Sequence, residues 1–143
     1  MFQLNVLVLF GNFRVDGFVF PRVMGEAFEV YATENGIDCN YEDFCFVAMD
    51  DGKIAGAITG RAYYNEVHVG DLIVAKECRG KDVGTKLMLA VEEEYRGKGR
   101  ENINLSTYEF QARGFYEKLG YEVEFVRPNS IPKLTKYFLR KKL

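Results

Sequence analysis

The apolar pattern of the chain changes its period once, near residue 80, and this change restricts the fold more than any other feature. Before it, three apolar stretches of strand length, residues 44–49, 54–64 and 66–75, follow one another with only short turns between them. The first turn, Asp50-Asp51-Gly52-Lys53, contains an Asp-Gly pair that tolerates positive φ, as tight hairpins require. Consecutive strands joined in this way predict an antiparallel meander.

After residue 80 the apolar residues recur at helical spacing as far as Gly97, and Gly97 and Gly99 are typical of a helix end. The same reasoning predicts a strand over residues 102–107, a short helix over 112–119, and two last strands over 121–126 and 134–142. A strand–helix–strand unit after an antiparallel meander predicts an α/β (α+β) fold with a mixed, mostly antiparallel central sheet flanked by helices.

The N-terminal part gives a mixed signal. Residues 2–10 favour a strand, and residues 21–35 favour a helix with Pro21 in its first turn and Gly36 at its end. Residues 11–20 are compatible with either a hairpin turn or the approach to that helix. Because the chain has 143 residues without a repeat or a low-complexity linker, we expect residues 1–143 to form one domain.

The composition excludes several classes of protein. With 19 basic and 21 acidic residues the formal net charge is −2, which excludes a domain built mainly as a basic nucleic-acid platform. No apolar run is long enough to span a bilayer, so we expect neither a nucleic-acid nor a membrane partner. The three cysteines and the single histidine are widely spaced and form no zinc motif, so we expect no metal and reduced thiols in a cytoplasmic protein.

A glycine-rich segment, Arg79-Gly80-Lys81-Asp82-Val83-Gly84-Thr85, follows the last strand of the meander and begins the next helix. Unpaired N–H groups at a helix start attract phosphate, and the basic side chains of this segment add positive charge. A phosphorylated ligand is therefore one interpretation, and a strand-to-helix turn without a ligand explains the two glycines equally well. The spacing matches neither the P-loop pattern nor the dinucleotide fingerprint.

Two motifs that lie in this order resemble those of one family. Leu72-x-Val74 followed by Arg79-Gly80-Lys81-x-Val83-Gly84 is similar to the acetyl-CoA-binding motif of the GNAT superfamily of N-acetyltransferases, (Gln or Arg)-x-x-Gly-x-(Gly or Ala). Downstream, Phe115-Tyr116-Glu117-Lys118-Leu119-Gly120-Tyr121 resembles the second signature, Phe-Tyr-x-x-x-Gly-(Phe or Tyr), and the flanking residues resemble small bacterial members. The close match covers residues 66–126. The chain departs from the first motif at Asp82, where the pattern has a glycine.

The resemblance implies an acyl-CoA N-acyltransferase fold and an acetyl-CoA-dependent transfer to a primary amine of a small molecule or peptide. The alternative is a non-catalytic acyl-CoA-binding or sensing module of the same fold, which Asp82 favours because a carboxylate repels phosphate. The residues that would bind acetyl-CoA by this resemblance are Ile73, Val74 and Ala75, through their backbone along the pantetheine arm, and Arg79, Gly80, Lys81, Val83, Gly84 and Thr85 around the pyrophosphate.

The resemblance also assigns candidate catalytic groups. Tyr116 matches the tyrosine that protonates the departing CoA thiolate, and it would therefore lie against the cofactor as well. His68 lies where family members often place a base, and an imidazole accepts a proton near neutrality. Glu66 shares the face of His68 by the period of two, whereas Asp71 is expected on the other face; each could act as the base or bind a cationic substrate. A structural histidine and a packed tyrosine are the alternatives for His68 and Tyr116.

The remaining expectations concern other polar and aromatic residues. Ser106, Thr107 and Tyr108 end a predicted strand and are expected either to face the substrate or to form a polar edge. The tyrosines expected mainly to pack are Tyr31, Tyr41, Tyr95, Tyr121 and Tyr137. The C-terminal strands offer a sheet edge at which a second copy could pair, so a homodimer is one expected assembly.

Overall fold

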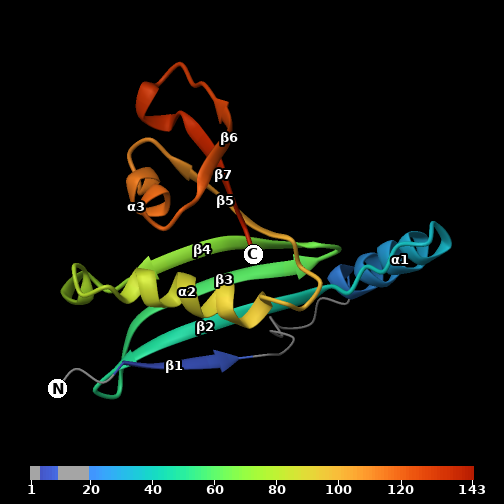
Figure 1. Cartoon of the computed structure of the whole chain (residues 1–143), viewed down its shortest axis with the longest axis horizontal. Helices are drawn as coiled ribbons and strands as arrows, with labels where there is room; N and C mark the ends of the chain where they lie inside the picture. Colours follow the sequence, from blue (N-terminus) through green and yellow to red (C-terminus); the bar gives the residue numbers. More distant parts are fainter. Residues whose placement is uncertain (1–3, 10–19) are drawn as a thin grey trace.

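The computed structural model describes residues 4–9 and 20–143, with side chains from residue 25 onward. Its strands form one seven-stranded sheet in the order β1-β2-β3-β4-β5-β7-β6 (Figure 1). The elements in chain order are β1 (Leu4–Leu9), α1 (Phe20–Glu34), β2 (Glu42–Asp50), β3 (Lys53–Tyr63), β4 (Glu66–Val74), a 3-10 turn (Lys76–Cys78), α2 (Val83–Tyr95), β5 (Asn102–Tyr108), α3 (Arg113–Lys118), β6 (Glu122–Arg127), a 3-10 turn (Pro132–Leu134) and β7 (Lys136–Lys142). The predicted fold class is confirmed, whereas the alternatives for residues 11–20 fall almost wholly outside the described residues.

The meander and the crossover predicted from the sequence are both present. β1, β2, β3 and β4 pair antiparallel in sequence order, and the β2–β3 turn places Asp51 at φ 46° and Gly52 at φ 75°, as an Asp-Gly hairpin requires. α2 connects β4 to β5, which pair parallel, and β7 pairs antiparallel with both β5 and β6. The sheet is therefore mixed and mostly antiparallel.

The core lies between α2 and the strands β2, β3 and β4, over which the helix runs (Figure 1). Leu87 and Met88 of α2 are fully buried there, because helical spacing puts them on the face that meets the sheet. Gly60 of β3 makes room in this core for Phe44 of β2. A Cβ at Gly60 would lie 2.7 Å from Cε1 of the buried Phe44, so only glycine leaves room for that ring.

A β-bulge interrupts β4 at Gly70, because the pairing with β3 skips this residue. Val69 before the bulge is buried, and Leu72 after it packs against the same core, so the face of each later side chain is reversed relative to a regular strand. Asp71 consequently lies on the same face as His68. The prediction that Asp71 faces the other side is wrong, since the period of two does not continue through a bulge.

α1 lies beyond one end of the sheet (Figure 1), and Ala32 is its only buried residue from position 25 onward. Of the tyrosines expected to pack, Tyr95 and Tyr121 are buried, whereas Tyr31 is 67% exposed and Tyr41 is 55% exposed. Helical spacing shows which residues share a face but does not show whether another element covers that face.

Two kinds of feature are absent from the part of the chain that the structure describes. None of its helices is both long and apolar enough to cross a bilayer. No group of three or more His, Cys, Asp or Glu side chains in it is placed to hold a metal ion. The three cysteines Cys39, Cys45 and Cys78 are free thiols.

Candidate active site

β4 and β5 pair along a short stretch and then separate. The pairs are Glu66 with Asn102, Val67 with Ile103 and His68 with Asn104. In Figure 1, β5 leaves β4 and continues with β7 and β6 as a separate half of the sheet. Among the described residues no strand pairs with this side of β4 beyond His68, so one edge of β4 is open over residues 69–74.

The open edge of β4 presents backbone groups of Leu72 and Val74. On the other edge, the N–H of Ala75 donates to the carbonyl oxygen of Ala55 at 2.8 Å. Opposed residues in an antiparallel pair alternate between bonded and unbonded pairs, so Ile73 also bonds to β3. Leu72 and Val74 turn their backbone groups to the opposite side, into the fork, which is the opening between β4 and β5 beyond His68. Of the three residues expected along a pantetheine arm, Val74 therefore lies at the open edge with Leu72, and Ile73 and Ala75 bond to β3.

The turn after β4 has the backbone geometry of an anion site. Gly80 and Asp82 take positive φ values of 75° and 61°, and α2 follows directly. The first hydrogen bond of α2 runs from the N–H of Lys86 to the carbonyl oxygen of Asp82 at 3.0 Å. The N–H groups of residues 83–85 consequently have no partner within the helix, which is the arrangement that binds phosphate.

The charge around this turn is mixed. Nε of Arg79 donates to the carbonyl oxygen of Val74 at 3.2 Å, which holds the guanidinium between the open edge and the turn. Lys81 adds a second cation to the same segment, and it lines a pocket together with the acidic residues Asp50, Asp51 and Glu77. The carboxylate of Asp82 makes no capping hydrogen bond to the helix and opposes an anion by its charge. The turn therefore fits a pyrophosphate in its backbone and its cations, with Asp82 acting against it.

Gly84 brings the two sequence motifs together. A Cβ at this position would lie 3.3 Å from Cζ of Phe115, so the start of α2 packs directly against α3. Phe115 in turn meets Tyr116 edge to face, with 5.0 Å between the ring centroids. Packing thus explains the second glycine of the turn, and it places the tyrosine of the second motif near the start of α2.

Tyr116 is 8% exposed and packs against the rings of Phe115 and Tyr121. Burial raises the pKa of its hydroxyl above the ordinary value, because the charged form would lose its hydration. The hydroxyl is therefore protonated at neutral pH, which is the state that a proton donor needs.

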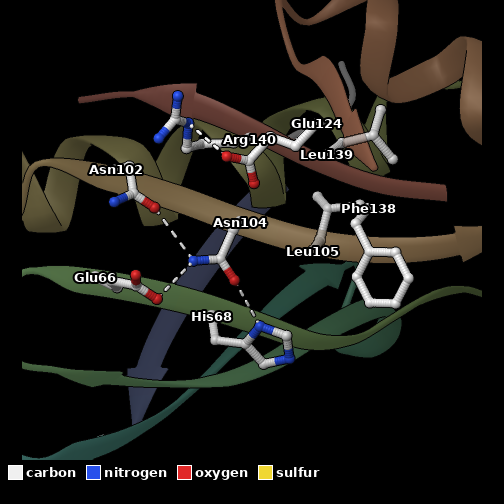
Figure 2. Close-up of a pocket in the computed structure, with 9 residues that line it drawn as sticks. All are labelled: Glu66, His68, Asn102, Asn104, Leu105, Glu124, Phe138, Leu139 and Arg140. Atoms are coloured by element: carbon white, nitrogen blue, oxygen red, sulfur yellow. Dashed lines mark hydrogen bonds and ion pairs between the residues drawn. The ribbon is translucent and has the colours of Figure 1, made fainter. Parts of the chain in front are cut away.

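A pocket of about 240 Å³ lies where β4, β5, β6 and β7 meet (Figure 2). Most of its polar lining comes from side chains that alternate with the core-facing residues of β4 and β5, and the rest from β6 and β7. The residues that line it are Glu66, His68, Asn102, Asn104, Leu105, Glu124, Phe138, Leu139 and Arg140. Glu66, His68, Asn102 and Asn104 belong to the paired stretch of β4 and β5, so the pocket lies over this stretch, next to the point where the strands separate.

Asn104 joins the polar residues of this pocket (Figure 2). Its Oδ1 is 2.8 Å from Nδ1 of His68, and its Nδ2 is 3.1 Å from Oε2 of Glu66 and 3.2 Å from Oδ1 of Asn102. The structure therefore connects Glu66 and His68, two predicted catalytic residues, through an amide that neither motif contains. The register of the parallel pair would have identified it, because Asn104 lies directly opposite His68.

The other predicted residues lie farther along the same strands. Asp71 is exposed on the face of His68, beyond the bulge. Ser106 and Tyr108 lie on the pocket face of β5, because they alternate with its buried residues. Thr107 lies on the opposite face and is 4% exposed, and its hydroxyl bonds to the segment that leads into α3. Thr107 is therefore a residue of the core side and not of the pocket.

Known proteins are similar to this chain in sequence and in fold. The model of the Acetyltransferase (GNAT) family matches residues 15–121. A blasticidin-S acetyltransferase of Streptomyces morookaense is 29% identical over 124 residues, which are 86% of this chain and 82% of that protein. The crystal structure of an acetyltransferase from Bacillus cereus superimposes with a TM-score of 0.74 at 25% identity, over 92% of this chain and 98% of that one. An N-acetyltransferase from Thermoplasma acidophilum, crystallised in complex with coenzyme A, superimposes with a TM-score of 0.57 at 20% identity, over 84% of this chain and 70% of that one.

Proposed function

This chain belongs to the acetyltransferase (GNAT) family, and we propose that it transfers the acetyl group of acetyl-CoA to the primary amine of a small molecule or peptide. One observation carries this proposal. The open edge of β4 lies between a proton-accepting side chain, His68, and the anion-type turn at residues 79–85. A long substrate with phosphate at one end and a reactive group at the other would need an anion site, an extended edge for its middle part, and a proton acceptor at its reactive end, in this order.

The turn and the open edge would hold acetyl-CoA mainly through backbone groups. The N–H groups of residues 83–85, with Arg79 and Lys81, would bind the pyrophosphate. The amides of a pantetheine arm would pair with Leu72 and Val74 as an added strand does. Asp82 opposes this binding by its charge, while its backbone keeps the shape that the turn requires.

When bound, acetyl-CoA supplies a thioester whose acetyl carbon is open to attack. His68 is proposed to take a proton from the acceptor, so that the amine nitrogen forms a C–N bond as the C–S bond breaks. Tyr116 is proposed to donate its proton to the leaving thiolate, because its hydroxyl is protonated at neutral pH. The carboxylates of Glu66 and Asp71 would attract a cationic amine to this face of β4.

We propose a cationic small-molecule amine as the acceptor. Glu66 and Asp71 supply negative charge on the face that carries His68. The relative from Streptomyces morookaense is named for the acetylation of blasticidin S, which makes this compound the first one to test. Amino acids, polyamines and peptides with free amino groups complete the panel.

Release of free thiol from acetyl-CoA in the presence of the amine panel tests the proposal. We expect acetyl-CoA to bind in a calorimetric titration and at least one amine to be acetylated. Lys81→Ala should weaken acetyl-CoA binding about tenfold, whereas Lys98→Ala, which removes an exposed lysine paired with Glu94 at the far end of α2, should not. Binding without turnover of any amine would favour the non-catalytic module, and absence of binding would contradict the proposal.

A further inference from the structure

We propose that Asn104 is a positioning residue: oriented by Glu66, its side-chain carbonyl holds His68 in the Nδ1–H tautomer and leaves Nε2 as the open proton acceptor. This inference rests on the proposed function only in giving His68 the role of base. The juxtaposition itself rests on three hydrogen-bond distances in the pocket of Figure 2.

The orientation of the Asn104 amide follows from its partner. An ionised carboxylate can only accept hydrogen bonds, and Oε2 of Glu66 lies 3.1 Å from one end of the amide. That end must therefore be the NH₂ group, since the reverse orientation would oppose two oxygens. The second donor of the same NH₂ group reaches Oδ1 of Asn102 at 3.2 Å. The amide carbonyl is then the end that faces His68.

The tautomer of His68 follows from the orientation of the amide. Oδ1 of Asn104 can only accept, and it lies 2.8 Å from Nδ1 of His68, so Nδ1 must carry the hydrogen. A neutral imidazole carries one ring hydrogen, which leaves a lone pair on Nε2. Figure 2 shows Nε2 on the side of the ring away from Asn104, and no residue that the structure describes bonds to it. A histidine side chain in water favours the Nε2–H tautomer, so the network selects the less favoured tautomer, whose proton-accepting nitrogen is Nε2.

The Asn104 amide fixes the tautomer of His68 without favouring the charged form of the ring. A carboxylate in contact with Nδ1 would favour the protonated imidazolium, which cannot accept a proton. Asn104 instead keeps Glu66 one side chain away from His68. The other charged groups that face His68 are Arg61, directly opposite on β3, Asp71 beyond the bulge of β4, and the pair of Arg140 on β7 and Glu124 on β6, whose Nε and Oε1 are 3.2 Å apart.

The single histidine of this chain makes the tautomer directly measurable. In protein labelled with ¹⁵N-histidine, long-range ¹H–¹⁵N spectra at alkaline pH show the resonances of one pair of ring nitrogens. We expect a protonated Nδ1 and an unprotonated Nε2 in the wild-type protein. Asn104→Ala should move the tautomer ratio about fivefold toward Nε2–H, since one hydrogen bond is lost. Asn102→Ala is the graded control, because it removes only the second acceptor of the Asn104 NH₂ group and leaves Glu66 to orient the amide; the wild-type tautomer should remain dominant.

Two further variants keep the test decisive if Asn104→Ala does not fold. Asn104→Asp retains an acceptor for the Nδ1 hydrogen but adds a charge, so it should keep the tautomer and move the rising limb of the pH–rate profile to higher pH. Glu66→Gln removes the group that orients the amide and should give a mixture of tautomers.

A wild-type spectrum dominated by Nε2–H, or the same tautomer ratio in Asn104→Ala as in the wild type, would overturn the inference. The spectra are recorded without acetyl-CoA, so they are independent of turnover. A protein with the expected tautomer that acetylates no amine would contradict the proposed function and support the positioning role. In active protein, Asn104→Ala should lower kcat and leave the KM for acetyl-CoA unchanged, because Asn104 lies at the pocket and not at the turn; an unchanged kcat would also overturn the inference.

Discussion

β4 pairs with β3 along its whole length except at the Gly70 bulge, but with β5 along only the three pairs that start at Glu66. The half of the sheet formed by β1–β4 is further covered by α2, whose Leu87, Met88 and Val91 are fully buried against it. The half formed by β5, β7 and β6 is joined to it by the short parallel ladder and by contacts of α2 with β7 and α3. One half is therefore covered by α2 and fully paired, and the other is joined to it by a short ladder and by a shared core to which Ile103, Leu105 and Leu139 contribute.

The difference between the halves explains where the proposed site lies. On the paired stretch of β4, side chains such as His68 meet partners from β5, so a polar network can be held in place. On the open stretch, the backbone of Leu72 and Val74 has no strand beside it, so it can hold a ligand. Beside the fixed side chains of its paired stretch, β4 therefore offers the backbone of Leu72 and the N–H of Val74 at its open edge, while the Val74 carbonyl accepts from Arg79.

The largest expected effect is a loss of stability, caused by a substitution in the core of the half formed by β1–β4. In Gly60→Val, the new Cβ would lie 2.7 Å from Cε1 of Phe44 and closer still to the carbonyl oxygen of His68. We expect a loss of more than about 3 kcal/mol in the free energy of unfolding, measured in urea, because neither the ring nor the backbone can move away. Gly70→Ala is the control, since its Cβ would have 3.5 Å to its nearest neighbour, and it should cost under about 1 kcal/mol.

The next effect concerns chemistry contributed from the other half. Tyr116→Phe removes the proposed donor and keeps the packed ring, so the acetylation rate should fall about 100-fold with little change in unfolding free energy. Tyr121→Phe provides the control, because the Tyr121 hydroxyl bonds to Glu92 at 3.1 Å and has no proposed role in transfer. Equal rates in wild type and Tyr116→Phe would exclude Tyr116 as the acid.

A buried ion pair ties the two halves together. Nζ of Lys141 on β7 lies 2.9 Å from Oε2 of Glu92 on α2, and Glu92 is 1% exposed. Lys141→Met should cost about 2 kcal/mol of unfolding free energy, because it leaves the carboxylate buried without this partner, and the partial exposure of Lys141 moderates the loss. Lys142→Met, at an exposed neighbouring position, should be nearly neutral. A similar cost in both variants would show that the halves are not joined here.

Alkaline pH should lower the free energy of unfolding through a buried tyrosine in each half. Burial raises the pKa of Tyr95, which packs on Phe44, and of Tyr121, which bonds to Glu92, so both hydroxyls stay protonated in the folded chain at pH values where the unfolded chain ionises them. Their stabilising contribution is complete below pH ~10 and declines above it by up to about 1.4 kcal/mol per pH unit for each group. Unfolding free energies measured across this range should fall less steeply in Tyr95→Phe, and an unchanged slope would contradict the assignment.

The packed half could be predicted almost completely from the sequence, and the fork could not. Alternation, the Asp-Gly turn and the change to helical spacing specify local structure, so β2, β3, β4 and α2 have nearly their predicted limits. The bulge at Gly70 has no local signature, because a glycine in a strand is compatible with a bulge or with close packing, and it reversed the predicted face of Asp71.

The candidate site divides in the same way. Glu66, His68 and Tyr116 were indicated by motif and position, whereas Asn104 became visible only through the register of β4 on β5. Register between strands separated by a helix depends on how the crossover packs, and no spacing along the chain encodes it. The exposure of Tyr31 has a related cause, since its spacing defines a face and only tertiary structure decides what covers it.

The smallest effect tests the residue at which the chain departs from its family's motif. Asp82 has φ 61°, in the left-handed region, and is the N-cap residue of α2. Asp82→Gly should raise the unfolding free energy by about 1 kcal/mol, because glycine adopts this conformation without strain, and it should tighten acetyl-CoA binding by removing a negative charge. Asp82→Asn separates the two causes, since asparagine tolerates the same φ and carries no charge. If calorimetry shows tighter binding in both variants while only glycine stabilises the fold, charge limits the affinity and strain limits the stability. If neither variant binds acetyl-CoA more tightly, the carboxylate points away from the phosphate and the open backbone alone determines affinity.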